Sequence, residues 1–338
     1  MLSKGAQKRY KKIESFLMKD NFNGFTKDDL FIMSFIKKGW GQDIAALSNM
    51  AEALVNIAIM DPDHLDSSRQ LIKEVVKRAI HPKVNPYKKP FDQVTSFGEY
   101  GYYLEHLNII LGSYRRIASD DKCIKLNERI SNHLLEKSLK HANCHAILIP
   151  YVKMRWPADQ AAILYSLWLY DKNNNTDISS NLISKWLDYM DNAGTHKETG
   201  LFISEVLGTR RYSNQPRGCS HAYLIHYMSR FCSSKAKLQW ELFKKHMMGR
   251  KFGKIAFREF LPDFSSKWSP DSGPIIAGAG IAASGLGMNA ASSIEDLELY
   301  SSINKGAKII LSILNLIKWI PGIKIITRIA TDLLASAI

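Results

Sequence analysis

Apolar residues recur along most of the chain at intervals of three and four positions, which is the spacing of one face of an α-helix. Strand-like alternation is rare, and its best example is the run HAILIPYV at residues 145–152. Breaks rich in Pro, Asp, Asn and Gly separate the periodic segments. The pattern predicts an all-α protein with helices at residues 3–19, 27–38, 41–59, 66–80, 97–117, 121–140, 158–171, 177–190, 196–207, 219–231, 234–249, 272–291 and 294–338.

The helices predicted between about residues 97 and 291 come in pairs joined by short turns, without a strict sequence repeat. A helical hairpin that cannot bury its own apolar face must pack against its neighbours. We therefore predict a helical toroid, an (α/α) barrel, in preference to a solenoid. The expected organisation is an N-terminal helical segment at 1–90, a barrel domain at 91–300 and a cationic amphipathic tail at 301–338.

The composition suits a large globular core, with 46% hydrophobic residues in a chain of 338. The formal net charge of +14 favours an anionic partner such as nucleic acid, an acidic carrier protein or an anionic membrane surface. No recognised nucleic-acid module is present, so we do not expect nucleic acid. The N-terminal sequence is too charged for a secretory signal, which favours the cytoplasm. Neither a disulfide framework nor zinc-type spacing is formed by the cysteines Cys123, Cys144, Cys219 and Cys232.

The stretch QPRGCSHAYLIHYMSRF (215–231) predicts a helix that begins at Gly218 or Cys219. Free backbone N–H groups and the helix dipole would lower the pKa of a thiol there, and Arg217, a candidate for substrate binding, adds positive charge. Cys219 is therefore a candidate nucleophilic or acid/base thiol. His221 is a candidate for substrate binding and not the base for this thiol, since positions two apart on a helix point to different sides. Alternatively, Cys219 is a small residue at a close helix approach.

A second candidate group lies in GEYGYYLEHLN, where Glu99, Tyr102 and His106 share one face of the predicted helix. Tyr102 and His106 can donate or accept a proton, and Glu99 can orient the imidazole. The alternative is a hydrogen-bonded histidine of the core.

Two loops, each with a tryptophan, precede predicted helices and carry an aspartate. Asp159 follows Trp156 in WPADQ, and Asp271 follows Trp268 in WSPDSGP. Paired carboxylates at one rim of a toroid could perform acid/base chemistry, with the tryptophans binding substrate. The competing interpretation is that each aspartate caps its helix.

The segment FREFLP (257–262) adds Arg258 and Glu259 as candidates for substrate binding. Arg258 could hold a carboxylate or phosphate, or form a surface ion pair. The glycines of GAGIAASG (278–285) do not match a nucleotide-binding loop, so we expect them to allow tight helix packing. No metal site and no cofactor are expected.

Two segments resemble the linalool dehydratase-isomerase family: EHLNIILGSYRRIASDD (105–121) and WPADQAAILYSLWLYD (156–171). The family pairs a His-Leu-Asn helix with a proline-led loop that opens the next inner helix. The resemblance spans about residues 95–291 and implies an (α/α)6 barrel with an apolar cavity and polar catalytic groups at one end. The family's cysteine-rich loop is not reproduced, since only Cys144 lies nearby, and its reaction is not carried over.

The C-terminal segment 303–338 is apolar, carries lysines along its length and is interrupted by Pro321 and Gly322. Neither half reaches the ~20 apolar residues of a membrane-spanning helix. An anionic membrane surface is one predicted partner of this segment, with Trp319 at the interface. Packing on the barrel or on a second copy of the chain in a homo-oligomer is the alternative.

These features predict an enzyme that acts on an apolar small molecule or a carrier-bound acyl chain. The expected chemistry is cofactor-free acid/base or thiol-assisted catalysis: dehydration, isomerisation, cyclisation or acyl transfer. A glycoside-active toroid that uses Asp159, Glu259 or Asp271 as its carboxylate pair is a rival hypothesis. A non-catalytic basic scaffold that binds membrane, acidic protein or nucleic acid is the second alternative.

Overall fold

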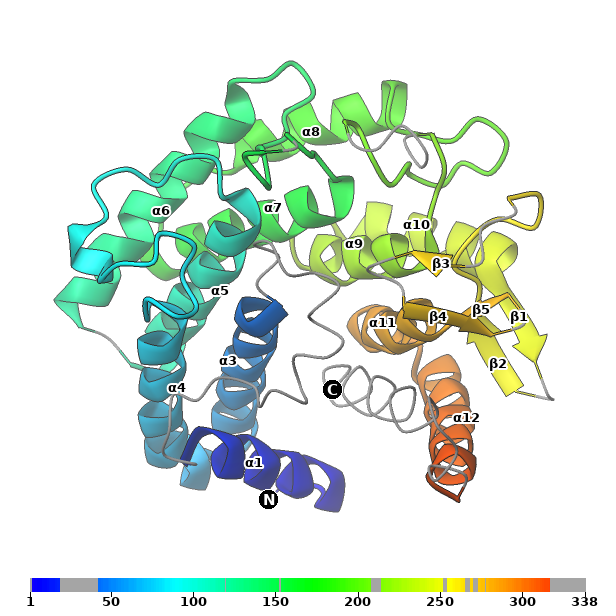
Figure 1. Cartoon of the computed structure of the whole chain (residues 1–338), viewed down its shortest axis with the longest axis horizontal. Coiled ribbons are helices and arrows are strands. Elements are labelled where there is room, and N and C mark those ends of the chain that lie inside the picture. Colours follow the sequence, from blue (N-terminus) through cyan, green and yellow to red (C-terminus); the bar gives the residue numbers. More distant parts are fainter. Residues whose placement is uncertain are drawn as a thin grey trace. The chain divides into compact units, whose positions relative to one another are not determined.

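The computed structural model describes residues 2–18, 42–118, 120–151, 153–207, 214–251, 254–264, 268–269, 273–276 and 278–316 (Figure 1). The predicted all-α class is confirmed. The described strands are short, and the helices carry the fold. Its helices of more than one turn are α1 (Lys4–Met18), α3 (Gln42–Met60), α4 (Leu65–Ala79), α5 (Gly101–Ile117), α6 (Asp121–Leu139), α7 (Pro157–Asn174), α8 (Ser180–Asn192), α9 (Gly218–Phe231), α10 (Ser233–Met247), α11 (Ile281–Ser293) and α12 (Leu297–Leu316).

The other elements among the described residues are two 3-10 turns and five short strands. The turns are η2 (Pro62–His64) and η3 (Phe91–Gln93). An antiparallel pair is formed by β1 (Met248–Lys251) and β2 (Lys254–Phe257). A three-stranded sheet in the order β3-β4-β5 is formed by Trp268–Ser269, Gly273–Ile276 and Ala279–Gly280.

The chain divides into two compact units, and each is described by itself. Unit 1 comprises residues 1–153 and 163–184, and unit 2 comprises residues 154–162 and 185–338. The predicted boundaries at residues 90 and 300 do not coincide with this division. Helix pairs of the kind that the predicted toroid needs are present in each unit, and the closure of a barrel stays a prediction.

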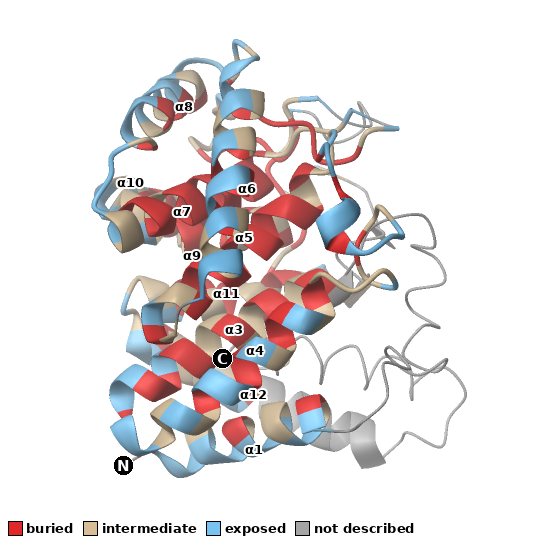
Figure 2. Ribbon diagram, turned by 90° about the vertical axis from the view of Figure 1, so that its left-hand side faces the viewer, coloured by how far each residue is buried: buried red, intermediate tan, exposed pale blue. Residues whose placement is uncertain are grey.

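In unit 1, α5 lies at the centre and packs against α3, α4 and α6. Nearly all of its side chains are buried, whereas α6 alternates between buried and exposed positions (Figure 2). The first amide of α5, Gly101 N–H, donates to the carbonyl of Ile147 at 3.1 Å. A Cβ atom at Gly101 would lie 2.7 Å from that oxygen, so only glycine allows this approach. The described residues of the run at 145–152 form an irregular segment that covers the start of α5, and despite their strand-like alternation they form no strand.

A buried network of amides and hydroxyls joins α5, α6 and α7 inside unit 1. Asn108 Nδ2 donates to Ser131 Oγ and to Ser166 Oγ, each at 3.0 Å. Asn127 Nδ2 donates to Asn108 Oδ1 at 2.7 Å. All four residues are buried, so Asn108 links three helices through neutral hydrogen bonds.

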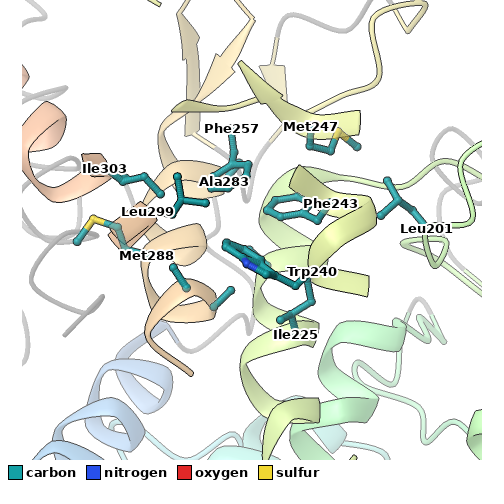
Figure 3. Packing of buried hydrophobic residues seen from close by; sticks show 13 residues of the cluster. Leu201, Ile225, Trp240, Phe243, Met247, Phe257, Ala283, Met288, Leu299 and Ile303 are labelled. Carbon is teal, nitrogen blue, oxygen red and sulfur yellow. The ribbon is translucent and has the colours of Figure 1, made fainter. Parts of the chain in front are cut away.

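The core of unit 2 lies between α9, α10, α11 and β2 (Figure 3). The rings of Phe243 and Phe257 stack there with centroids 4.4 Å apart, and Trp240 packs beside them. A Cβ atom at Gly287 of α11 would lie 2.5 Å from the Phe257 ring. The small residues of this segment thus allow close packing, as predicted, and α11 lies against α9.

Four predicted elements need correction or lie outside the described residues. Residues 196–207 are not helical, because Gly200 has φ of +72° and the segment forms bridges from Phe202 to Thr195 and from Leu207 to Arg155. The helix predicted from residue 272 begins only at Ile281, after β4 and β5. The predicted helix at 27–38 lies outside the described residues, as does the tail beyond residue 316. In the described part of the chain, no helix combines the length and the apolar character needed to cross a membrane.

Candidate functional site

An extended segment of unit 2 connects the starting points of two helices, α7 and α9. Val206 N–H donates to the carbonyl of Arg155 at 3.0 Å, and Arg155 N–H donates to the carbonyl of Leu207 at 2.7 Å. Two residues earlier, Ser204 N–H donates to the carbonyl of Gln215 at 3.1 Å. Arg155 lies two residues before the start of α7, and Gln215 lies three residues before the start of α9. Both helices therefore begin beside the same segment, residues 203–207.

Three carboxylate residues of unit 2 are buried on or near these chain segments. Asp159 in the first turn of α7 is 6% exposed, Glu205 on the extended segment is 3% exposed, and Glu259 after β2 is 0% exposed. Carboxylates are almost never buried to this degree unless they are paired or used in function. We call Asp159, Glu205 and Glu259 the carboxylate set, and it forms the candidate site together with Arg217 and Cys219.

Glu259 forms a buried ion pair with Arg217. Nε and Nη2 of Arg217 donate to Oε1 of Glu259 at 3.1 and 2.9 Å. The guanidinium also lies over the ring of Phe260, 5.7 Å from its centroid. Two desolvated charges this close are stabilised by each other and by these further contacts, and removal of either one leaves a buried charge. Arg217 is therefore held by Glu259 and is 5% exposed.

The same glutamate completes the N-terminus of α9. Gly218 N–H donates to the backbone carbonyl of Glu259 at 2.9 Å, and Cys219 N–H donates to Glu259 Oε2 at 3.2 Å. The first amides of a helix have no intrahelical partner, and a carboxylate there also suits the helix dipole. A Cβ atom at Gly218 would lie 2.0 Å from the carbonyl oxygen of Arg258, so glycine is required for this close approach.

Cys219 lies at the predicted helix start, but its surroundings differ from those expected of a reactive thiol. Its Sγ donates to Glu259 Oε1 at 3.0 Å, and Arg217 Nη2 lies 3.5 Å from the sulfur. A hydrogen bond from the thiol to a carboxylate favours the protonated form, which opposes the effect of the helix dipole and of the guanidinium. The side chain is 5% exposed. This geometry argues for Cys219 as part of the cluster around Glu259 and against an accessible nucleophile.

His221 points away from Cys219, in agreement with the helical spacing. Its ring stacks on Phe243 in the core, with centroids 5.4 Å apart. Burial lowers the pKa of His221 to about 4, so the ring is neutral at neutral pH. His221 is a core residue by position and does not line the cluster around Glu259.

The other predicted substrate-binding residues are placed differently. The half-buried Trp156 directly precedes α7, which begins at Pro157. Arg258 follows β2 directly, and its backbone N–H donates to the carbonyl of Met247. The next residue, Glu259, and not Arg258, forms the ion pair with Arg217. Trp268 contributes backbone to β3, and Asp271 lies outside the described residues.

The predicted group around His106 belongs to unit 1. His106 is 1% exposed, its ring meets that of the half-buried Tyr102 edge-on at 5.0 Å between centroids, and burial lowers its pKa to about 3. Glu99 precedes α5, which begins at Gly101, so it does not share a helical face with His106. The carboxylate beside the imidazole is instead that of Glu105, whose Oε1 lies 3.6 Å from His106 Nε2.

Among the buried acidic residues that the sequence analysis did not single out, Glu105 and Glu205 lie closest to predicted site residues, Glu105 beside His106 and Glu205 on the segment that contacts Arg155. Glu105 is 0% exposed on the buried helix α5 and is adjacent in sequence to His106. Glu205 fell in a segment that was predicted to be helical and was not singled out. Within the described residues, no group of three or more His, Cys, Asp or Glu side chains is placed to hold a metal ion.

Comparisons with known proteins give little further information. No family model matches the sequence, and no curated protein sequence matches it significantly. Among solved structures, the chain is similar to cellobiose 2-epimerase from Bacillus thermoamylovorans B4167, with a TM-score of 0.46 and 12% identity. The similarity covers 64% of this chain and 62% of the epimerase chain, less than two thirds of its length. A score below 0.5 carries no argument about function, and the resemblance to linalool dehydratase-isomerase stays a hypothesis.

Proposed function

We propose that the protein is an enzyme that moves protons on a small neutral organic substrate without a cofactor, as an isomerase or a lyase does. The observation that supports this proposal is the carboxylate set, three buried acids carried by segments that meet at the starts of α7 and α9. Buried carboxyl groups can divide acid/base work, one carrying the proton and another accepting one.

In this proposal Asp159 and Glu205 are the acid and base, and Glu259 is a positioning residue. The carboxylate of Glu259 is engaged by Arg217, by the Cys219 thiol and by the Cys219 N–H, while Gly218 N–H donates to the backbone carbonyl of Glu259. A carboxylate with this many donors stabilises the local structure and is a weaker base for a substrate proton. Asp159 also lies in the first turn of α7, where the helix dipole favours its charged form and thus the role of base.

His106 and Tyr102 remain proposed as a second acid/base pair in unit 1. Because burial lowers the pKa of His106 to about 3, the imidazole is neutral at neutral pH, with one ring nitrogen as a donor and the other as an acceptor. The thiol-assisted variant of the hypothesis is less favoured, because the Cys219 thiol is buried and donates a hydrogen bond to Glu259.

The proposal is tested by proton exchange in D2O, followed by NMR, with two classes of neutral substrate. One class is allylic alcohols of the isoprenoid type, and the other is aldoses and reducing disaccharides. We expect deuterium to enter a carbon position of one class in the presence of the wild-type protein. Asp159→Asn and Glu205→Gln should each slow this exchange by about 10²-fold or more, the usual contribution of a general acid or base.

Glu198→Gln provides the matched control, because Glu198 is an exposed carboxylate of the same unit. It should leave both exchange and the urea midpoint unchanged. If the wild-type protein exchanges no proton of either class, the enzyme proposal fails and the scaffold hypothesis gains. If exchange occurs and survives both substitutions, the assignment of the carboxylates is wrong.

A further inference from the structure

Helix α1 presents a row of lysines on the side opposite to its buried face. Its buried residues are Tyr10 and Leu17, and at 100° per residue they fall on one side of the helix. The four exposed lysines fall within an arc of about 100° on the other side. We call them the lysine stripe, and its members are Lys4, Lys8, Lys11 and Lys12.

The stripe does not contribute to the stability of the helix. Lys4 and Lys8, and likewise Lys8 and Lys12, are like charges at i and i+4, a spacing that destabilises a helix by about 0.2–0.5 kcal/mol per pair. Among the described residues, no acidic side chain forms an ion pair with any of the four. The only acidic residue of α1 is Glu14, which lies outside the arc. An electrostatic cost without a partner inside the unit indicates a partner outside it.

Hydrogen bonds and a ring contact connect α1 to the rest of unit 1, with the lysine stripe on the exposed side of the helix. The Tyr10 hydroxyl donates to Ser67 Oγ at 2.6 Å, and its ring meets His64 edge-on. Near the other end, Arg78 Nη2 donates to the carbonyl of Leu17 at 2.6 Å. Leu2 N–H, just before the helix, donates to a carboxylate oxygen of Asp61 at 3.0 Å. The lysines therefore stand on a helix that is fixed at both ends.

We propose that the lysine stripe docks the protein on an anionic lipid surface. Along the helix axis the stripe is about 12 Å long and straight, so a flat surface can meet all four ammonium groups together. The buried residues of α1, Tyr10 and Leu17, face the rest of unit 1, and the exposed Met18 stands at the end of the helix beyond the stripe, so we expect a mainly electrostatic contact.

The composition of the stripe favours lipid over nucleic acid. All four members are lysines, which act as hydrated point charges, whereas bidentate phosphate recognition in nucleic acids favours arginine. No aromatic residue lies within the arc to stack on a base. The apolar, lysine-bearing sequence at 303–338 suits the same kind of surface.

The test compares binding of full-length variants to vesicles that contain phosphatidylserine and phosphatidylcholine in equal amounts. Substitution of the whole stripe by glutamine should weaken binding at least tenfold, since each lysine near an anionic surface strengthens binding about fivefold. The charge reversals Lys8→Glu and Lys11→Glu together should have a comparable effect. Added salt should weaken the binding of the wild-type protein as well.

A control of equal charge separates the stripe from the net charge of +14. It replaces four lysines of, or directly after, α6 by glutamine: Lys122, Lys125, Lys137 and Lys140. This variant should bind vesicles within about twofold of wild type, since these lysines lie near the two ends of a different helix.

Four outcomes would overturn the proposal. The first is a wild-type protein that does not bind the vesicles. The second is a stripe variant that binds as wild type, which would assign the contact to another segment such as 303–338. The third is an equal loss in both lysine variants, which would show attraction by net charge alone. The fourth is a stripe variant that loses binding to duplex DNA and keeps binding to vesicles.

Discussion

Unit 1 and unit 2 each contain a buried polar cluster, and the two clusters are built on different chemistry. In unit 1 the cluster is neutral and centres on Asn108, which links three helices through amides and hydroxyls. In unit 2 it is charged and centres on Glu259, which binds Arg217, Cys219 and the start of α9. Both clusters are removed from solvent.

The difference indicates which cluster serves structure alone. A neutral network has no charge to remove from water, and its burial costs little where its hydrogen bonds form. A buried ion pair costs several kcal/mol of desolvation per ion, and apolar residues of the same volume are often more stable. The charged cluster of unit 2 therefore needs a reason beyond stability, and its proximity to the chain segments that carry Glu205 suggests one, the positioning of the proposed site.

The largest expected effect is the loss of stability in acid, to which both units contribute. Burial lowers the pKa of His106 in unit 1 to about 3 and that of His221 in unit 2 to about 4, below the ordinary value of 6.5. The unfolded chain therefore takes up these protons first as the pH falls below about 6.5, and stability decreases toward the folded pKa values. Two such groups lose about 5 kcal/mol by pH 4.5, at about 1.4 kcal/mol per pH unit each.

Urea unfolding at several pH values measures this loss, and hydrogen exchange locates it. We expect a flat stability above pH 7 and a steep decline below pH 6. Each of the variants His106→Asn and His221→Asn should reduce the slope, the first through unit 1 and the second through unit 2. A stability at pH 4.5 equal to that at pH 7.5 would contradict the neutral, buried state of both rings.

Removal of the Glu259 carboxylate in unit 2 should have the next largest effect on stability. Glu259→Ala leaves the Arg217 guanidinium buried without its partner and the Cys219 N–H at the start of α9 without its carboxylate acceptor. We expect a loss of about 3–5 kcal/mol in the free energy of unfolding, measured by urea titration. Replacing both members, as Arg217→Leu with Glu259→Leu, should recover much of this loss while abolishing the proposed exchange activity. If Glu259→Ala lowered the free energy of unfolding no more than Glu198→Gln does, the ion pair would be solvated in solution.

Disruption of the neutral cluster of unit 1 should lower the free energy of unfolding by less. Asn108→Ala deprives Asn127, Ser131 and Ser166 of a common partner, and the cost of such buried unsatisfied groups is about 1–3 kcal/mol. Calorimetry under the same conditions as for Glu259→Ala gives the comparison directly. If the loss at Asn108 matched or exceeded that at Glu259, the distinction between the two clusters would fail.

The smallest effect is a difference in alkylation rate between two thiols, which does not require any change in stability. Cys219 is 5% exposed and bonded to Glu259, whereas Cys232 is partly exposed, with its sulfur 4.0 Å from Ser234 Oγ. We expect alkylation near neutral pH to label Cys232 at least tenfold faster than Cys219, as measured by mass spectrometry of the native protein. Faster labelling of Cys219 would restore the hypothesis of a reactive thiol at the helix start.

The sequence by itself determined the elements whose stabilising contacts are local. The start of α9 at Gly218 follows from the break at Pro216 and Gly218, and the opposite directions of Cys219 and His221 follow from helical spacing. The helical class follows from periodicity for the same reason, because an α-helix bonds residues four positions apart.

Only the tertiary structure decided which charged residues meet. Glu259 reaches Arg217 across 42 positions of sequence, and no local pattern marks that pairing. Residues 196–207 have an apolar spacing compatible with a helix, yet their extended form is set by hydrogen bonds to Arg155 and Gln215 from other parts of the chain. Glu205 is buried for that reason. Long-range contacts of this kind depend on the packing of whole elements, and they place the carboxylates of the proposed site.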